Sequence, residues 1–143
     1  MEYKRCQNTV IVRLDPGDEI VAELRKIAEA EKITFAAVSG LGAVGYMKAG
    51  CYSRTEEVYK SYEKTGDMEI VSLTGNVNTM DGETYLHLHI SVADGSGSVF
   101  GGHLSEAVIS CTAEIVLSCV PTSVDRSRDE ATGLNLFDFN KEA

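Results

Sequence analysis

One segment of this sequence carries the clear spacing of an amphipathic helix, and it stands alone among segments with strand-like patterns. Ile20, Val21, Leu24, Ile27 and Ala28 recur at intervals that place them on one side of a helix. Most other apolar residues fall in alternating or β-branched runs bounded by turn signals. One helix among about seven strands predicts an α+β fold, in which a mostly antiparallel sheet packs with one main amphipathic helix at about residues 17–32.

The strand signals are joined by short, glycine-containing segments, which favours hairpins. Residues 40–45 are rich in glycine, and we expect a flexible turn there, where the backbone passes close to another part of the chain. Residues 55–64 are polar and rich in tyrosine and are expected to form an exposed hairpin or strand pair. Turns are expected at residues 80–83 and 94–97. Strands are expected at residues 9–14, 35–39, 47–53, 68–77, 84–93, 99–100 and 108–120.

The length of 143 residues predicts a single domain over residues 1–143. A polar segment at residues 122–133 follows the last long strand, and the apolar residues 134–139 are expected to dock on the body as a short edge strand. No run approaches the ~18–20 apolar residues that span a bilayer. The N-terminus also lacks the apolar core of a secretory signal, so we expect a cytoplasmic protein with no membrane partner.

The charge balance argues against nucleic acid as a direct partner. The chain has 22 Asp and Glu residues against 13 Lys and Arg residues, a net charge of −9. Such a surface repels the phosphate backbone. The longest basic cluster is Lys4 and Arg5, and the sequence has no arm rich in arginine or lysine. We therefore expect no direct binding of nucleic acid by this chain.

The three histidines of the chain, His87, His89 and His103, all fall in one predicted hairpin. Side chains alternate along a strand, so His87 and His89 project from the same face with Cα atoms ~7 Å apart. A two-residue loop at residues 95–96 would pair His103 with Leu88, on the opposite face. A loop longer by one residue, or a bulge at residues 101–102, would bring His103 to the face of the other two histidines.

Three imidazoles on one face predict a metal site. Neutral imidazole nitrogens bind Zn²⁺ at ~2.0–2.1 Å, and Ni²⁺, Co²⁺ and Cu²⁺ share this donor preference. Three protein ligands leave one open coordination position for water or for the carbonyl or carboxylate of a small ligand. We therefore expect zinc, or another divalent transition metal, at His87, His89 and His103. The alternative is a strand of exposed or hydrogen-bonded histidines that holds no metal.

Four short motifs, taken together and in order, resemble the plants-and-prokaryotes conserved (PPC) domain. They are GLGA at residues 40–43, EIVSLTGN at residues 69–76, HLH at residues 87–89 and GGHL at residues 101–104. The resemblance extends from about residue 8 to residue 136, in the stand-alone prokaryotic type. It implies an α+β fold, a homotrimer, and a metal, with zinc as the first choice, on the three histidines.

The plant members of this family carry an AT-hook that binds the minor groove of DNA, and this chain contains no Arg-Gly-Arg-Pro core of such a hook. The plant domain also contacts other regulators through a segment that aligns with residues 66–71. Where the plant proteins have Arg-Phe in that segment, this chain has Asp67 and Met68. Near the third histidine, Glu106 and Ala107 stand where the family usually has a glycine.

A more distant resemblance is to the zinc-dependent acetolactate decarboxylases, which share a strand with an H-x-H motif and a later histidine. In those enzymes the metal polarises a keto acid, and carboxylates and an arginine complete the site. The resemblance makes Arg13 and Glu69 the candidate catalytic residues of this chain. The alternative is that Arg13 is a strand charge in solvent and that Glu69 is an ordinary residue of an alternating strand, sharing a face with Val71 and Leu73.

Three functions follow as hypotheses. The first is a metal-binding homotrimer with a regulatory or ligand-sensing role and a small-molecule ligand at the metal. The second is a metal-dependent lyase or hydrolase that acts on a small carbonyl or carboxylate compound. The third is a DNA-associated regulatory protein, in keeping with a family of candidate DNA-binding proteins.

Overall fold

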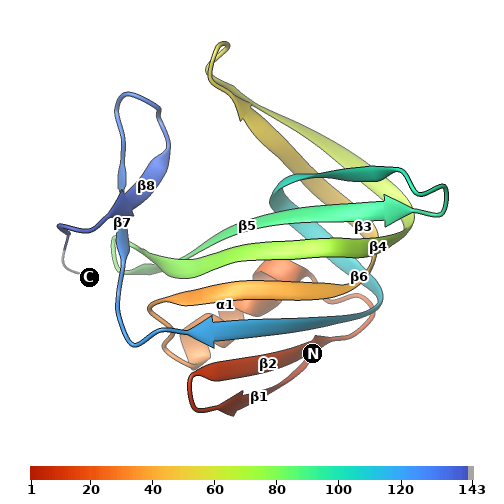
Figure 1. The fold of residues 1–143 in the computed structure, drawn as a ribbon, viewed down its shortest axis with the longest axis horizontal. Helices are drawn as coiled ribbons and strands as arrows, with labels where there is room; N and C mark the ends of the chain where they lie inside the picture. Colours follow the sequence, from red (N-terminus) through yellow and green to blue (C-terminus); the bar gives the residue numbers. More distant parts are fainter. Residues whose placement is uncertain (142–143) are drawn as a thin grey trace.

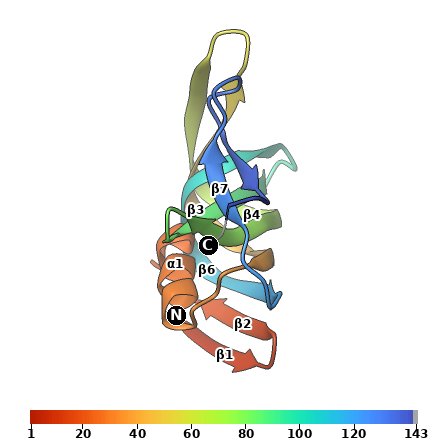
Figure 2. The same cartoon turned by 90° about the vertical axis from the view of Figure 1, so that its left-hand side faces the viewer.

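A six-stranded antiparallel sheet carries one helix on one of its faces (Figures 1 and 2). The computed structural model describes residues 1–141. Strands follow the order β1-β2-β6-β3-β4-β5, and β5 also pairs with β6, so that β3, β4, β5 and β6 close into a ring of paired strands. The predicted α+β fold is confirmed. Its elements are β1 (Glu2–Cys6), β2 (Thr9–Leu14), α1 (Ile20–Ala30), β3 (Ala36–Ser53), β4 (Val58–Met80), β5 (Glu83–Asp94), β6 (Val99–Cys119), β7 (Asp125–Arg128) and β8 (Asn135–Asp138).

Helix α1 forms where the apolar stripe predicts it, but it is shorter at both ends than residues 17–32. The carboxylate of Glu19 caps its first turn, accepting hydrogen bonds from the backbone N–H groups of Val21 and Ala22. The same carboxylate accepts a third bond from the backbone N–H of Ala107 at 3.0 Å, which ties the start of the helix to β6. Lys32 has a φ of 51°, in the left-handed region, and lies just beyond the end of the helix.

The expected turn at residues 40–45 is wrong, because this glycine-rich segment lies inside the continuous strand β3. The pairing of β3 with β4 and with β6 shifts register beside these glycines. The close backbone approach expected there is present. A Cβ on Gly42 would lie 2.4 Å from the carbonyl oxygen of Thr112. Glycine at this position therefore lets two strands come together and does not break the strand.

The predicted single face of Glu69, Val71 and Leu73 is also wrong, because β4 changes register relative to β5 between Ile70 and Ser72. Leu73 is buried in the core, whereas Glu69 and Val71 are exposed. A bulge inserts an extra residue and so exchanges the faces of the residues that follow it.

The hydrophobic core lies between α1 and the sheet face that it covers. Leu88, Ile90 and Val92 of β5 point into it, as do Ile115 and Leu117 of β6. Leu24 and Ile27 supply the helical side of the same contact. Burial of this continuous apolar surface is the main stabilising contribution to the fold. Leu88, which lies between His87 and His89 in the sequence, belongs to this core and so anchors their strand from the opposite face of the sheet.

The opposite face of the sheet is not covered by α1. Residues directly paired across an antiparallel sheet share a face. One such row runs across the sheet from His89 through Thr74, Ser39 and Val116 to Ile11. The histidines therefore lie on the uncovered face, at the end of a row that finishes with exposed apolar side chains.

The C-terminal residues do not extend the main sheet. β8 pairs with β7 in a separate two-stranded sheet, which stands beside the end of β4 (Figure 1). This hairpin is attached through the buried Asn78, whose side-chain amide donates to the carbonyl oxygen of Val124 at 3.2 Å. Phe137 of β8 also packs on Phe35 with ring centroids 6.1 Å apart. The segment expected as an edge strand thus forms one wall of a cleft. In residues 1–141, no helix has the length and apolar character that a membrane crossing requires.

Candidate metal centre

The hairpin between β5 and β6 brings the three histidines together. Ala93 pairs with Val99, and His89 pairs directly with His103. A carboxylate oxygen of Asp94 accepts hydrogen bonds from the backbone N–H groups of Ser96 and Ser98, at 2.9 and 3.2 Å. These bonds hold a loop one residue longer than the two-residue turn. Of the two routes that bring His103 to the histidine face, the longer loop is the one observed.

The glycine pair at residues 101–102 has a different role from the expected bulge, since the pairing of β5 with β6 continues through it without a register shift. A Cβ on Gly101 would lie 2.3 Å from the carbonyl oxygen of Ile90, and one on Gly102 would lie 2.5 Å from that of Gly50. Both positions therefore require glycine for close contact with the neighbouring strands. This contact places His103 between β3 and β5.

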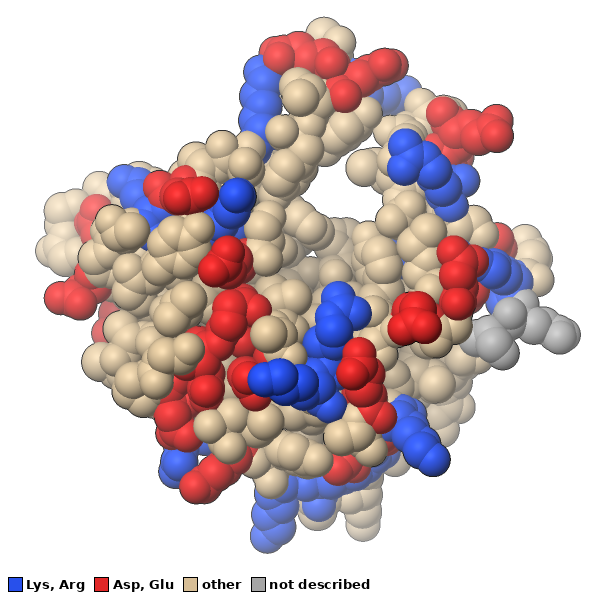
Figure 3. Space-filling view, turned by 180° about the vertical axis from the view of Figure 1, so that it is seen from behind, with Lys and Arg blue, Asp and Glu red and all other residues tan. Residues whose placement is uncertain are grey.

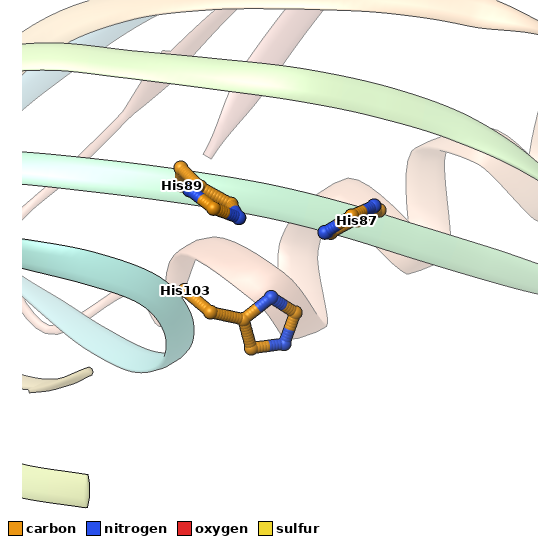
Figure 4. Close-up of side chains that lie close together, drawn as sticks. All are labelled: His87, His89 and His103. Atoms are coloured by element: carbon orange, nitrogen blue, oxygen red, sulfur yellow. The ribbon is translucent and has the colours of Figure 1, made fainter. Parts of the chain in front are cut away.

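The three imidazole rings, two from β5 and one from β6, lie close together, as Figure 4 shows. Their ring centroids are separated by 5.3 Å for His87 and His89, 5.2 Å for His87 and His103, and 5.6 Å for His89 and His103. One nitrogen from each ring can be chosen so that all three lie within 4.8 Å of one another. Nitrogens bound to one tetrahedral ion at ~2.0–2.1 Å stand about 3.4 Å apart, so small ring rotations would complete such a site.

Burial and neighbouring charges hold the rings of His87 and His103 in their neutral form. Burial, followed by the positive charge of Arg126, lowers the pKa of His87 from 6.5 to about 4. Burial, followed by His89, also lowers the pKa of His103. Both rings are therefore uncharged at neutral pH, which is the state that binds metal. The hydroxyl of Tyr59 donates to the backbone carbonyl of His103 at 3.1 Å, and its ring meets the imidazole edge-on.

The histidines line a cleft of about 810 Å³. Its walls come from β5 and β6, from the projecting ends of β3 and β4, and from the β7–β8 hairpin. Seen from behind, the molecule is open between those projecting ends and the C-terminal hairpin (Figure 3). The aromatic and apolar lining residues are Tyr52, Tyr59, Tyr85, Leu134, Leu136 and Phe137. A cleft of this size can hold a small organic molecule beside the histidines.

Arg126 is the residue of this cleft that the sequence analysis missed. It lies on β7, its guanidinium is within 3.4 Å of Nδ1 of His87, and only 4% of its surface is exposed. Because a guanidinium can only donate, this contact favours the neutral ring of His87. The available signal was the alternation of Arg126 and Arg128 in an otherwise irregular polar segment. It could not be interpreted without knowing that the segment folds back over the histidines.

The two candidate catalytic residues lie away from the histidine cleft. Arg13 is an exposed residue of β2 that forms ion pairs with Glu2 and Asp15, at 3.2 and 3.0 Å. Glu69 is exposed on β4, at a position that pairs with Ala43 and Ala93. Neither residue lines the histidine cleft. The structure thus brings the three histidines together but brings neither of these residues to them.

The fold and the site define an α+β domain with a three-histidine cluster on the uncovered face of its sheet. The chain belongs to the Plants and Prokaryotes Conserved (PCC) domain family, also abbreviated PPC, whose family model matches residues 1–121. The matched range includes all three histidines and ends before the hairpin that carries Arg126.

Solved structures with this fold include two that match almost the whole chain. A candidate DNA-binding protein from Bacteroides thetaiotaomicron is 31% identical, with a TM-score of 0.95 over 98% of each chain. A metal-containing protein from Archaeoglobus fulgidus is 32% identical, with a TM-score of 0.84, and the match covers 95% of this chain and 96% of that one.

Two further matches are partial. The α-acetolactate decarboxylase of Bacillus subtilis shares the fold at 15% identity and a TM-score of 0.57, over 85% of this chain and 57% of the enzyme. A bifunctional protein GlmU from Synechococcus is 35% identical over 130 residues, which are 85% of this chain. The chain spans only 18–19% of the length of the curated relatives that it matches.

Proposed function

We propose that this protein is a metal-binding homotrimer with a regulatory or ligand-sensing role, and that His87, His89 and His103 hold the metal. The observation that carries the proposal is the convergence of three imidazoles from two paired strands within 4.8 Å. Three nitrogen donors suit zinc, or another divalent transition metal. The similar protein from Archaeoglobus fulgidus, described as metal-containing, supports this reading.

Each part of the site has a defined task in this proposal. In this proposal His87 and His89 supply two donors from one strand, which the buried Leu88 anchors in the core. His103 supplies the third donor from β6, with its backbone held by Tyr59. A bound metal would act as a Lewis acid with one open position facing the cleft. A small ligand at that position is the molecule that the protein would sense.

The uncovered sheet face supports the homotrimer. Ile11, Leu41 and Val71 are 53%, 56% and 58% exposed, and together with Val116 they line a second hollow, a groove of about 780 Å³ at the β1–β2 end of the sheet. Exposed apolar side chains gathered on one face of a sheet are typical of an interface between subunits. We propose that a second copy of this chain covers the groove in each subunit.

The metal hypothesis is tested by elemental analysis after the metal-free protein has been dialysed against Zn²⁺ and then against buffer. The wild type should retain close to one zinc per chain, and the His87→Ala/His89→Ala double variant should retain almost none. Ser91→Ala is the matched control, because it lies on the same strand at the same side of the pleat. Full zinc content in the double variant would end the metal hypothesis.

A metal-dependent lyase or hydrolase is the second candidate, because Arg126 stands beside the histidines in a cleft large enough for a substrate. The lining, as far as the described chain shows it, holds no Asp or Glu that could act as a general acid or base. This absence favours ligand sensing over catalysis. The fold shared with acetolactate decarboxylases does not make catalysis the better supported proposal.

A DNA-associated role is the third candidate, supported by relatives that are described as candidate DNA-binding proteins. The net charge of −9 favours an indirect association through other proteins over direct contact. Direct contact would give a mobility shift of duplex DNA at low salt that disappears as the salt concentration rises. We expect no shift at any salt concentration.

A further inference from the structure

Among the described residues, the charged side chains that line the histidine cleft are all arginines, although the chain as a whole has a net charge of −9. Arg126 and Arg128 line the cleft beside the three histidines, and no carboxylate of residues 1–141 does so. Acidic side chains are instead spread over the outer surface (Figure 3). A cleft lined by charge of one sign attracts a ligand of the opposite sign.

Arg126 is a buried cation without an anionic partner. Within the described residues, its side chain bonds only to neutral groups, namely the side-chain oxygens of Asn78 and Asn76 at 3.0 and 3.1 Å and the backbone carbonyl of Asn135 at 2.6 Å. A buried charge is costly unless it is paired. The two asparagines fix the guanidinium in place, but they do not neutralise it.

The guanidinium retains hydrogen-bonding capacity. Three of its five N–H groups are used in the bonds to oxygen. A fourth faces Nδ1 of His87 at the long distance of 3.4 Å, and the fifth makes no hydrogen bond to any described residue. The planar group lies over the rings of Tyr85 and Phe137, with its central carbon 4.7 and 4.3 Å from their centroids. It is therefore held ready to donate to an oxygen anion in the cleft.

The remaining lining favours an organic anion over a free inorganic one. Tyr52, Tyr59, Leu134 and Leu136 provide aromatic and apolar surface around the histidines. Such surface gains stability from covering the body of an organic molecule and gains nothing from a small hydrated ion. A carboxylate has the size and planar geometry that a guanidinium recognises.

We propose that the ligand of this cleft is a small organic acid, whose carboxylate bonds to Arg126 and whose apolar part packs on the aromatic and leucine side chains. The inference rests on the proposed metal-binding function, because the metal would provide the second cationic contact. It also assigns a task to the C-terminal hairpin, which supplies Arg126, Leu134 and Leu136. That hairpin lies beyond the residues matched by the family model.

The test compares benzoate with benzamide, its neutral counterpart of nearly the same shape, by titration calorimetry of the wild-type protein in its metal-free and zinc-loaded forms. The metal-free form isolates the contribution of Arg126. Benzoate should bind on the order of tenfold or more tightly than benzamide, because only benzoate forms charge-assisted hydrogen bonds. Equal affinities would overturn the proposal. Tighter binding of inorganic phosphate than of benzoate would also overturn it, because the apolar lining would then have no role.

In the metal-free protein, Arg126→Gln should remove most of the preference for benzoate, while Arg54→Gln, the same substitution at an exposed position outside both hollows, should leave it unchanged. An unchanged preference in Arg126→Gln would contradict the assignment of this arginine. The comparison of benzoate with benzamide needs only wild-type protein, so it decides the proposal even where the variant does not fold.

Zinc content is measured on the same samples, which separates the two hypotheses. If the protein binds zinc but does not distinguish benzoate from benzamide, metal binding is supported and recognition of an organic acid by Arg126 is contradicted. If the protein binds no zinc, the proposed metal-binding function is contradicted. In that case the metal-free titration still decides the inference, because Arg126 alone should maintain a preference for benzoate.

Discussion

Two hollows of nearly equal size lie on the sheet face that α1 leaves uncovered, and they differ in charge. Among the described residues, the charged side chains that line one are all arginines, whereas the other is lined by charges of both signs, such as Arg13 and Glu114. The histidine cleft, of about 810 Å³, is lined by three histidines and two arginines, whereas the groove, of about 780 Å³, exposes Ile11, Leu41 and Val71. A row of paired residues joins the two hollows across one sheet. The same scaffold thus carries a cleft with arginines at one end, which we propose as the ligand site, and a groove with exposed aliphatic side chains at the other, which we propose as the subunit contact.

The largest expected effect is on assembly, and it separates the two hollows. The double change Leu41→Glu/Val71→Glu places two charges in the groove, and burying them at a subunit contact would be strongly unfavourable. The mass measured by light scattering should fall from about three times the 15.5 kDa of one chain to that of one chain. Zinc content should not change.

The control for this variant is Val99→Glu, which adds a charge at another exposed valine, outside the groove. It should leave the mass unchanged. If the groove variant keeps its full mass, the groove is not the subunit contact. If the groove variant loses zinc as well as mass, metal binding in the histidine cleft depends on assembly through the groove.

A smaller effect, on the stability of the fold, is expected from a change on the core face of β5, the strand that carries His87 and His89. Leu88 is 1% exposed, so Leu88→Ala should lower the free energy of unfolding by ~2–5 kcal/mol through lost burial and the cavity left behind. The measurement is denaturant unfolding of metal-free protein at one fixed protein concentration. Val99→Ala removes the same kind of side chain from a position that is 59% exposed, and should change the value by less than about 0.5 kcal/mol. Equal effects of the two changes would contradict the described packing.

The smallest expected effect is on the pH dependence of stability in the metal-free protein. The pKa of His87 falls from 6.5 to about 4 on folding, so between these values the unfolded chain binds more protons than the folded chain. Stability should therefore decrease as the pH is lowered from 6.5 to about 4, with no contribution from His87 above pH 6.5. The measurement is the midpoint temperature of thermal unfolding, recorded at a series of pH values between 6.5 and 4.5.

His87→Gln should make the dependence on pH shallower, because the side chain no longer titrates, while Arg54→Gln, at an exposed position, should leave its slope unchanged. A wild-type midpoint that stays constant from pH 6.5 to pH 4.5 would show that His87 is not held neutral by the fold.

The sequence predicted most reliably the elements whose own side chains define them. The stripe from Ile20 to Ala28 predicts α1, because its apolar residues face one core, and residues 9–14 predict β2 with the observed bounds. The glycines at residues 40–45 were misread as a turn, because their function lies in a partner strand distant in sequence. A bulge in β4, set by its pairing with β5, likewise moved Glu69 and Val71 out of register with Leu73.

The candidate site likewise contains residues whose positions follow from the local sequence and residues whose positions depend on distant contacts. His87 and His89 could be placed on one face from their spacing alone, whereas the position of His103 depended on a loop that the side chain of Asp94 stabilises. Arg126 could not be foreseen, because the fold of the C-terminal hairpin over the cleft depends on contacts such as that between Asn78 and Val124. The resemblance to acetolactate decarboxylases predicts a catalytic role for Arg13, but its ion pairs with Glu2 and Asp15 hold it away from the histidines.

The most direct test of the central claim is a crystal structure of protein purified with zinc, recorded with anomalous scattering at the zinc absorption edge. We predict one strong anomalous peak per chain between the rings of His87, His89 and His103, at ~2.0–2.1 Å from a nitrogen of each. A map with no peak at that point, and with the three rings turned away from one another, would contradict the account.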